Sequence, residues 1–230
     1  LRRVPAPFLD CTNLLSMQDP SNSWFRLVSR GWRSLEPVAA QLFLPQKAYA
    51  SVLGTCCLGG GAMFASVPKP LWSRIIAPDE RHRIRLAMRC LLLEGHGRRI
   101  LVDVGMGDKF SAKLMDIYGV QLSPTLEESL LAEGIEPASI TDVVLTHLHF
   151  DHAGGATVRT EKGLAPRLPG ARWYVQRRNW DNAHAPNPRE RASYMPENYD
   201  ALAEAGVLEF WDGPRQPWPG VSILTAEGHT

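Results

Sequence analysis

Hydrophobic and polar positions alternate in a way that predicts a β-hairpin in the first half of the chain. Residues 49–54 form a predicted strand, and residues 83–94 alternate before becoming continuously apolar, as a strand does when it enters a core. A glycine-flanked turn at 95–97 leads into a returning strand at 99–104. Asp103 stands at the end of that strand, where a carboxylate is costly unless it is paired or hydrogen-bonded.

The next pattern is helical and predicts a βαβ unit. Residues 123–135 carry an apolar stripe, with Thr125 and Glu128 placed as a capping box and Gly134 placed as a C-terminal cap. A strand at 141–146 follows this helix, which is typical of a layered α/β domain. Further strands are predicted at 172–176, 207–211 and 221–225, with helices at 177–184 and 196–206.

Two regions show no regular period. Residues 1–47 contain scattered prolines and tryptophans, so we interpret them as an N-terminal extension and place the domain at 48–230. Residues 59–61 are three glycines and predict a bend rather than a phosphate-binding loop, because the required spacing of later glycines and lysine is missing. Prolines at 68, 70 and 78 predict a loop in the stretch that follows.

Four possible metal ligands lie within six residues at the end of the strand predicted at 141–146. They are His147, His149, Asp151 and His152, and two glycines follow shortly afterwards. In an extended chain His147, His149 and Asp151 would project to one side, with His152 turned towards a second point. Zinc needs three or four ligands converging at about 2.0–2.2 Å. The cluster therefore predicts a metal site, with half-shells for two ions, at the usual location of sites in such sheets.

Composition narrows the classes of partner. Twenty-five Lys and Arg against twenty-four Asp and Glu give a net charge of +1, which disfavours a nucleic-acid footprint over the whole chain. No apolar run approaches the roughly 18–20 residues that span a bilayer, and the first residues do not form a convincing signal peptide. Four cysteines without a recognisable framework favour a reducing compartment, so we expect a cytoplasmic protein. A small-molecule substrate is expected from the hydrolytic chemistry described below.

The histidine cluster resembles the metallo-β-lactamase superfamily, and several flanking segments are similar to its lactonase and organophosphate-hydrolase-like branch. These segments are residues 60–64, 67–72, 101–105 and 228–230, so the resemblance covers about residues 50–230. It implies an αββα sandwich, and it implies that Asp103 supports the loop at 147–152. The residues alone leave Asp103 open as a strand-end cap.

The resemblance also adds a ligand. His229 follows a strand and Gly228 in a Gly-His-Thr segment similar to the third metal motif of the family. It would join His147 and His149 on a first metal, while Asp151 and His152 would belong to a second. The family pattern continues with a bridging aspartate and a final histidine beyond Thr230. We therefore expect a chain truncated at its C-terminus, with an incomplete second site.

A hydrolytic mechanism follows from this ligand set. Zinc held by three neutral imidazoles lowers the pKa of its water to about 7 and supplies a hydroxide nucleophile. Asp151 would orient that water or act as general base, and Tyr194 would donate a hydrogen bond to the developing oxyanion. Tyr194 is otherwise a packed ring with a satisfied hydroxyl. The predicted reaction is hydrolysis of an ester-like bond, with a lactone as the leading substrate.

Other functions remain open on the sequence. The same chemistry serves phosphotriesters, β-lactams, thioesters and phosphodiesters, and imidazole with carboxylate also suits iron in a redox variant. A non-catalytic metal-binding fragment is the alternative outside the enzymes, because the second ligand set is incomplete.

Overall fold

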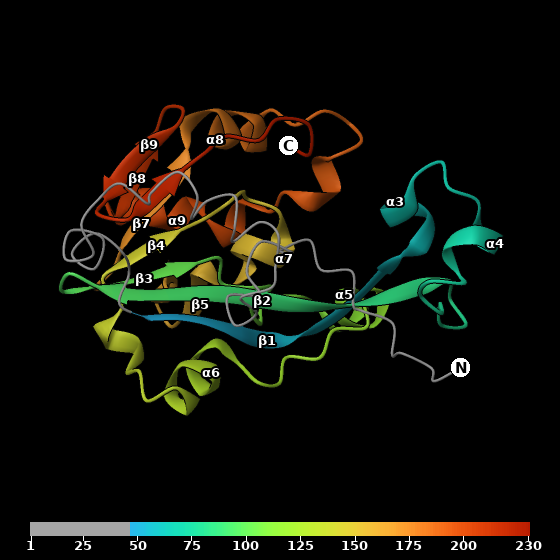
Figure 1. The fold of residues 1–230 in the computed structure, drawn as a ribbon, viewed down its shortest axis with the longest axis horizontal. Helices are drawn as coiled ribbons and strands as arrows, with labels where there is room; N and C mark the ends of the chain where they lie inside the picture. Colours follow the sequence, from blue (N-terminus) through green and yellow to red (C-terminus); the bar gives the residue numbers. More distant parts are fainter. Residues whose placement is uncertain (1–46) are drawn as a thin grey trace, which may run out of the picture.

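The computed structural model describes residues 47–230 and is built around a six-stranded mixed sheet (Figure 1). Its strands, in spatial order, are β1 (Lys47–Gly59), β2 (Arg83–Gly95), β3 (Arg98–Val102), β4 (Asp142–Val144), β7 (Arg172–Gln176) and β8 (Leu208–Trp211). The first three strands are antiparallel and the last four run parallel. The predicted hairpin and βαβ unit are therefore confirmed. The N-terminal extension, apart from Lys47, lies outside the described residues.

The two faces of this sheet bury different partners, because neighbouring side chains on a strand point to opposite sides. Leu101, Val143 and Trp173 belong to the larger core, which also contains residues of the helices α6 (Leu126–Ala132), α8 (Arg177–His184) and α9 (Asp200–Glu204). Val144 and Tyr174 face the other way and pack with Trp218 of a small two-stranded sheet. That sheet consists of β9 (Arg215–Trp218) and β10 (Val221–Ile223). The layering confirms the predicted α/β class.

The helix predicted at 123–135 forms as α6, with the caps that its sequence indicates. Thr125 and Glu128 make both hydrogen bonds of the capping box, and Gly134 has a φ of +74° beyond the helix end. Ser129 donates a hydrogen bond from Oγ to the carbonyl oxygen of Val52 at 2.9 Å. This bond fastens the helix to β1, at the edge of the sheet.

Two local predictions were wrong. The glycines at 59–61 do not form a bend, since β1 reaches Gly59 and the helix α3 (Gly60–Phe64) begins at once. Gly60 lies under the ring of Trp72, where an added Cβ would approach Cη2 to 2.3 Å. The proline-rich loop contains a short helix, α4 (Lys69–Trp72), because proline is tolerated in a first helical turn.

Several short elements escaped prediction because they hold too few residues to show a period. They are α5 (Ala112–Ile117), the hairpin of β5 (Thr157–Thr160) and β6 (Gly163–Pro166), β9, and three single 3-10 turns at Pro137–Ser139, Gly154–Ala156 and Arg191–Ser193. A fourth 3-10 turn, Pro196–Asn198, and α9 together occupy the helix predicted at 196–206. No helix within 47–230 is long and apolar enough to cross a membrane.

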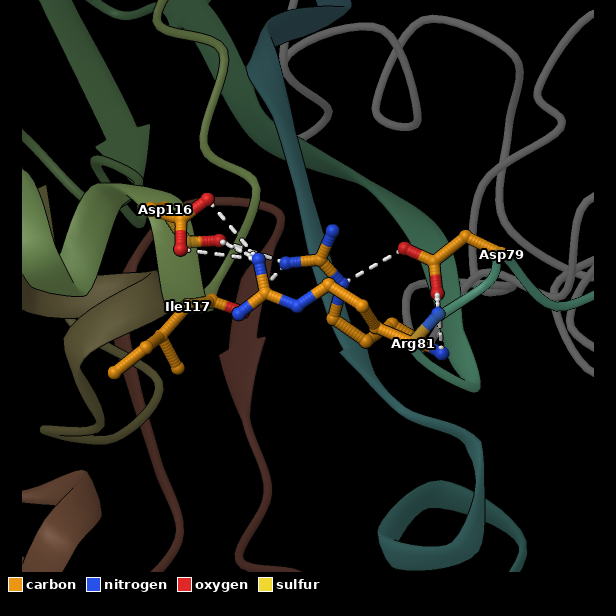
Figure 2. A network of polar contacts seen from close by, with 5 residues as sticks. Asp79, Arg81, Asp116 and Ile117 are labelled. Carbon is orange, nitrogen blue, oxygen red and sulfur yellow. Dashed lines mark hydrogen bonds and ion pairs between the residues drawn. The ribbon is translucent and has the colours of Figure 1, made fainter.

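Arginines at and just before the start of β2 form polar contacts with the end of α5. Arg81 approaches Asp116 to 3.0 Å, and Arg83 donates to the carbonyl oxygens of Asp116 and Ile117 at 2.7 Å each. Arg83 also pairs with Asp79, Nε to Oδ2 at 2.7 Å. Figure 2 shows Arg81 between Asp79 and Asp116. The Arg81 pair is well exposed, so we expect it to fix the position of α5 more than to add stability.

Candidate metal centre

The predicted ligands gather where β4 ends. Sheet pairing continues one residue beyond the strand, with Leu145 N bonded to Tyr174 O at 2.9 Å. His149 is the N-cap of the helix α7 (Phe150–Ala153), whose first turn closes through hydrogen bonds from the amides of His152 and Ala153 to His149 O. The prediction that the chain stays extended as far as Asp151 was therefore wrong. The helical turn begins one residue after His149 and redirects Asp151 and His152.

Three imidazoles meet at one point. The ring centroids of His147 and His149 are 4.6 Å apart, and that of His229 lies 5.0 and 4.9 Å from them. One nitrogen of each ring lies within 4.8 Å of the other two. The structure therefore brings together the three residues predicted to hold the first metal, although His229 lies 80 positions beyond His149 in sequence.

Two ring nitrogens of this group are buried without a hydrogen-bond partner: His147 Nε2 and His149 Nε2. Buried polar atoms are almost always paired, so two orphaned nitrogens on rings whose centroids are 4.6 Å apart call for an explanation. A cation that accepts both lone pairs supplies one. The residues present thus fit the metal that the ligand pattern implies, because three imidazoles with an open position are a set that zinc binds.

The environment keeps these rings neutral. Burial, reinforced by the neighbouring His152, His149 and His229, lowers the pKa of His147 to about 2. Burial and then His229 lower the pKa of His149 to about 4. A metal ligand must present an unprotonated nitrogen, so both groups are in the binding form at neutral pH without any proton release.

His152 is held differently, through a carboxylate. Its Nδ1 lies 2.8 Å from Asp103 Oδ2, and its ring centroid lies 4.0 Å from that of His147. Burial acts to lower the pKa of His152, but the hydrogen bond and charge of Asp103 outweigh it and raise the pKa. Asp151 follows, with its Oδ2 3.5 Å from His152 Nε2 and its side chain 26% exposed. These are the two residues predicted to hold a second ion, and the ring of His152 lies beside that of His147.

Asp103 ties the loop to the sheet. Its carboxylate accepts hydrogen bonds from Thr146 N at 2.8 Å and from Thr146 Oγ1, in addition to the contact with His152. The residue is 3% exposed and has a φ of +58°, a conformation that aspartate adopts more readily than most residues. Both readings of Asp103 are therefore combined, since it caps the strand end and supports the predicted metal loop.

Glycines after His152 let two loops touch backbone to backbone. A Cβ on Gly154 would come within 2.0 Å of Met106 O, and one on Gly155 within 2.2 Å of Val104 O. The amide of Gly155 donates to Gly105 O at 2.9 Å. Only glycine permits this approach, which sets the position of the loop carrying Asp151 and His152.

Tyr194 lies against the centre from the side of His149. Its ring centroid is 4.7 Å from that of His149, and the two residues form an isolated backbone bridge. The phenol is buried, and its oxygen accepts a hydrogen bond from Asn182 Nδ2 at 3.0 Å. The structure thus places Tyr194 next to a predicted ligand, with a partner that orients its hydroxyl.

Asn179 was missed by the sequence reasoning. From α8 its Oδ1 accepts the amide of Leu148 at 2.9 Å, and its Nδ2 donates to Thr230 Oγ1 at 2.9 Å. One side chain therefore joins the loop of His147 and His149 to the segment of His229. A lone asparagine in a polar helix carries no signal of this role, because the segments it joins are distant in sequence.

Comparisons with known proteins identify the family of this chain. The profile of the metallo-beta-lactamase superfamily matches residues 87–230. An N-acyl homoserine lactonase of Bacillus thuringiensis is 28% identical over 159 residues, which cover 64% of this chain and 56% of that protein. The chain thus spans about half the length of the curated relatives it matches.

Solved structures show the same fold. A probable metal-dependent hydrolase from Staphylococcus aureus superposes with a TM-score of 0.70 at 29% identity, covering 78% of this chain and 64% of that one. An N-acyl homoserine lactone hydrolase with N-hexanoyl-L-homoserine bound at its catalytic metal centre superposes with a TM-score of 0.59 at 24% identity, covering 81% and 68%. By fold, by histidine arrangement and by sequence profile, this chain belongs to the metallo-β-lactamase superfamily.

Proposed function

We propose that the protein is a zinc-dependent hydrolase that opens an ester-like bond, with a lactone as its substrate. The observation that carries this proposal is the pair of buried, unpartnered nitrogens His147 Nε2 and His149 Nε2 converging with His229. A site that keeps two lone pairs away from water without a protein partner is organised for a cation. The superfamily match and the N-acyl homoserine lactonases among the relatives support the choice of reaction and substrate.

His147, His149 and His229 would hold a first zinc ion, and Asp151 with His152 would contribute to a second. When bound, zinc lowers the pKa of a water molecule to about 7 and polarises a substrate carbonyl. The side chain of Asp151 is 26% exposed and lies next to His152, so it is the carboxylate that would orient the attacking water and accept its proton. This mechanism therefore needs no serine or cysteine nucleophile.

Tyr194 has the position of an oxyanion donor. Its oxygen already accepts the hydrogen bond from Asn182, which leaves the hydroxyl proton to be donated. Burial is the largest of the effects that raise the pKa of Tyr194, so the phenol stays protonated at neutral pH. A protonated phenol beside His149 can donate to the oxygen on which negative charge develops during attack.

The cytoplasm remains our proposal for the compartment. Cys56, Cys57 and Cys90 are free thiols in the part of the chain that the structure describes. Free thiols are typical of proteins kept in a reducing environment.

The direct test compares two histidine variants in one assay. The purified chain is loaded with zinc, its metal content is measured by elemental analysis, and hydrolysis of N-hexanoyl homoserine lactone is followed by proton release. His149→Asn should lower kcat/KM at least about 100-fold, because several kcal/mol of transition-state stabilisation are lost with the metal. His96→Asn is the matched control, since His96 lies exposed in the 95–97 turn and should retain full activity.

The outcomes separate the alternatives. Zinc bound at one ion or more per chain, with lactone turnover lost in His149→Asn, supports the proposal. Zinc bound without turnover of the lactone, a chromogenic phosphotriester or a chromogenic β-lactam would establish a metal-binding chain without hydrolytic activity. Equal turnover by His149→Asn and the parent chain would reject the site.

A further inference from the structure

Thr146 lies between the carboxylate of Asp103 and the ring of His147. Its Oγ1 is 2.8 and 3.0 Å from the two carboxylate oxygens and 3.1 Å from His147 Nδ1. The same carboxylate contacts His152 Nδ1 at 2.8 Å. One buried carboxylate thus reaches two histidines of the proposed centre, one directly and one through a hydroxyl.

Proton counting decides the direction of each bond. A carboxylate can only accept, and a threonine hydroxyl has one proton to donate. That proton goes to Asp103, because a hydrogen bond to a charged acceptor is stronger than one to a neutral imidazole. Oγ1 is then left as an acceptor towards His147, so the proton of the ring must sit on Nδ1. The unprotonated nitrogen is Nε2, the atom that is buried without a partner.

We infer that Thr146 is a positioning residue, which fixes the Nδ1–H tautomer of His147 and, through Asp103, couples the orientation of His147 to that of His152. This inference rests on the proposed metal centre, because the tautomer matters only if Nε2 is a ligand atom. The partner of the second ring nitrogen commonly sets the tautomer and orientation of a metal-binding histidine. Here a hydroxyl stands between the ring and the carboxylate.

The position of Thr146 separates this role from a structural one. Thr146 is solvent-exposed. The hydrogen bond that joins the strand end to Asp103 comes from the backbone amide of Thr146, so it is retained when the side chain is changed to valine or serine. Thr146→Val keeps the shape and removes only the hydroxyl, and Thr146→Ser keeps the hydroxyl and removes the methyl group. An effect seen in Thr146→Val and not in Thr146→Ser is therefore due to the hydroxyl.

The first experiment reads tautomers in the metal-free protein. Long-range ¹⁵N–¹H correlation spectra near neutral pH should show His147 with its proton on Nδ1 in the parent chain and in Thr146→Ser. In Thr146→Val the Nε2–H form should appear at His147, while His152 keeps its proton on Nδ1. Asp103→Asn should disturb both rings. An unchanged His147 signal in Thr146→Val would overturn the inference.

The second experiment measures zinc affinity by competition with a chromogenic chelator. Thr146→Val should bind zinc about 10- to 100-fold more weakly, the usual effect of removing a partner of a ligand. Thr146→Ser should stay close to the parent value, and equal weakening in both variants would refute the role of the hydroxyl. If the parent chain bound no zinc, the proposed function would fail, whereas the tautomer result in metal-free protein would still stand or fall by itself.

Discussion

Acidification should destabilise the metal-free chain through His147 and His149. In the fold, burial holds the pKa of His147 at about 2 and that of His149 at about 4, against an ordinary value of 6.5. The unfolded chain therefore binds protons below pH 6.5 that the folded chain does not accept. The stabilising contribution of these groups is fully present above pH 6.5 and is lost as the pH falls, down to about 4 for His149 and about 2 for His147.

The size of the effect follows from the burial of both rings. His147 is 9% exposed and His149 is 7% exposed, so solvent screens little of the penalty. Each histidine lowers the free energy of unfolding by up to about 1.4 kcal/mol per pH unit, which amounts to about 3 kcal/mol for both between pH 6.5 and 5. His152 acts with the opposite sign, because Asp103 raises its pKa in the fold. The net loss should therefore be smaller than the sum for the two buried rings.

Urea unfolding followed by tryptophan fluorescence tests this directly. The chain is treated with a chelator, and the free energy of unfolding is measured at pH 7, 6 and 5 for the parent and for His147→Asn/His149→Asn. The double variant should lose most of the pH dependence in this window, whereas His96→Asn should keep it. A double variant with the same pH slope as the parent would show that these rings titrate normally in the fold and would refute the reasoning.

Further predictions concern single positions. Gly154→Ala should cost about 2 kcal/mol or more in urea unfolding, because its Cβ would meet Met106 O at 2.0 Å, whereas Gly61→Ala meets nothing within 4 Å and should change stability little. Thr125→Ala should cost about 1 kcal/mol through loss of the capping box. Burial lowers the pKa of Lys109 to about 8, so the stability of the parent relative to Lys109→Met should rise by about 3 kcal/mol from pH 8 to 10.5, and a flat difference would contradict it. Tyr194→Phe should lower kcat at least about 10-fold with zinc content unchanged, and a normal kcat would remove the proposed oxyanion role.

Local patterns determined the elements that depend on neighbours in sequence. The β2–β3 hairpin and α6 were predictable because side-chain alternation, the capping box and Gly134 act within a few residues. The position of three histidines and an aspartate on one loop after a buried strand was predictable for the same reason, because these residues are neighbours in sequence. What failed was the assumption that the chain stays extended past His149, because a single helical turn leaves too few residues to show a period.

Only the tertiary structure decided how the centre is closed. His229 reaches His147 and His149 because β4, β7 and α8 bring the segments together, and Asn179 bridges them with two hydrogen bonds. The hydroxyl of Thr146 acquires its place between Asp103 and His147 only when β3 and β4 pair in parallel. Residue types and spacing along one loop show which side chains can bind a metal. The burial of the histidine rings, their tautomers and their convergence depend on contacts between segments distant in sequence, and only the packed tertiary structure makes these contacts.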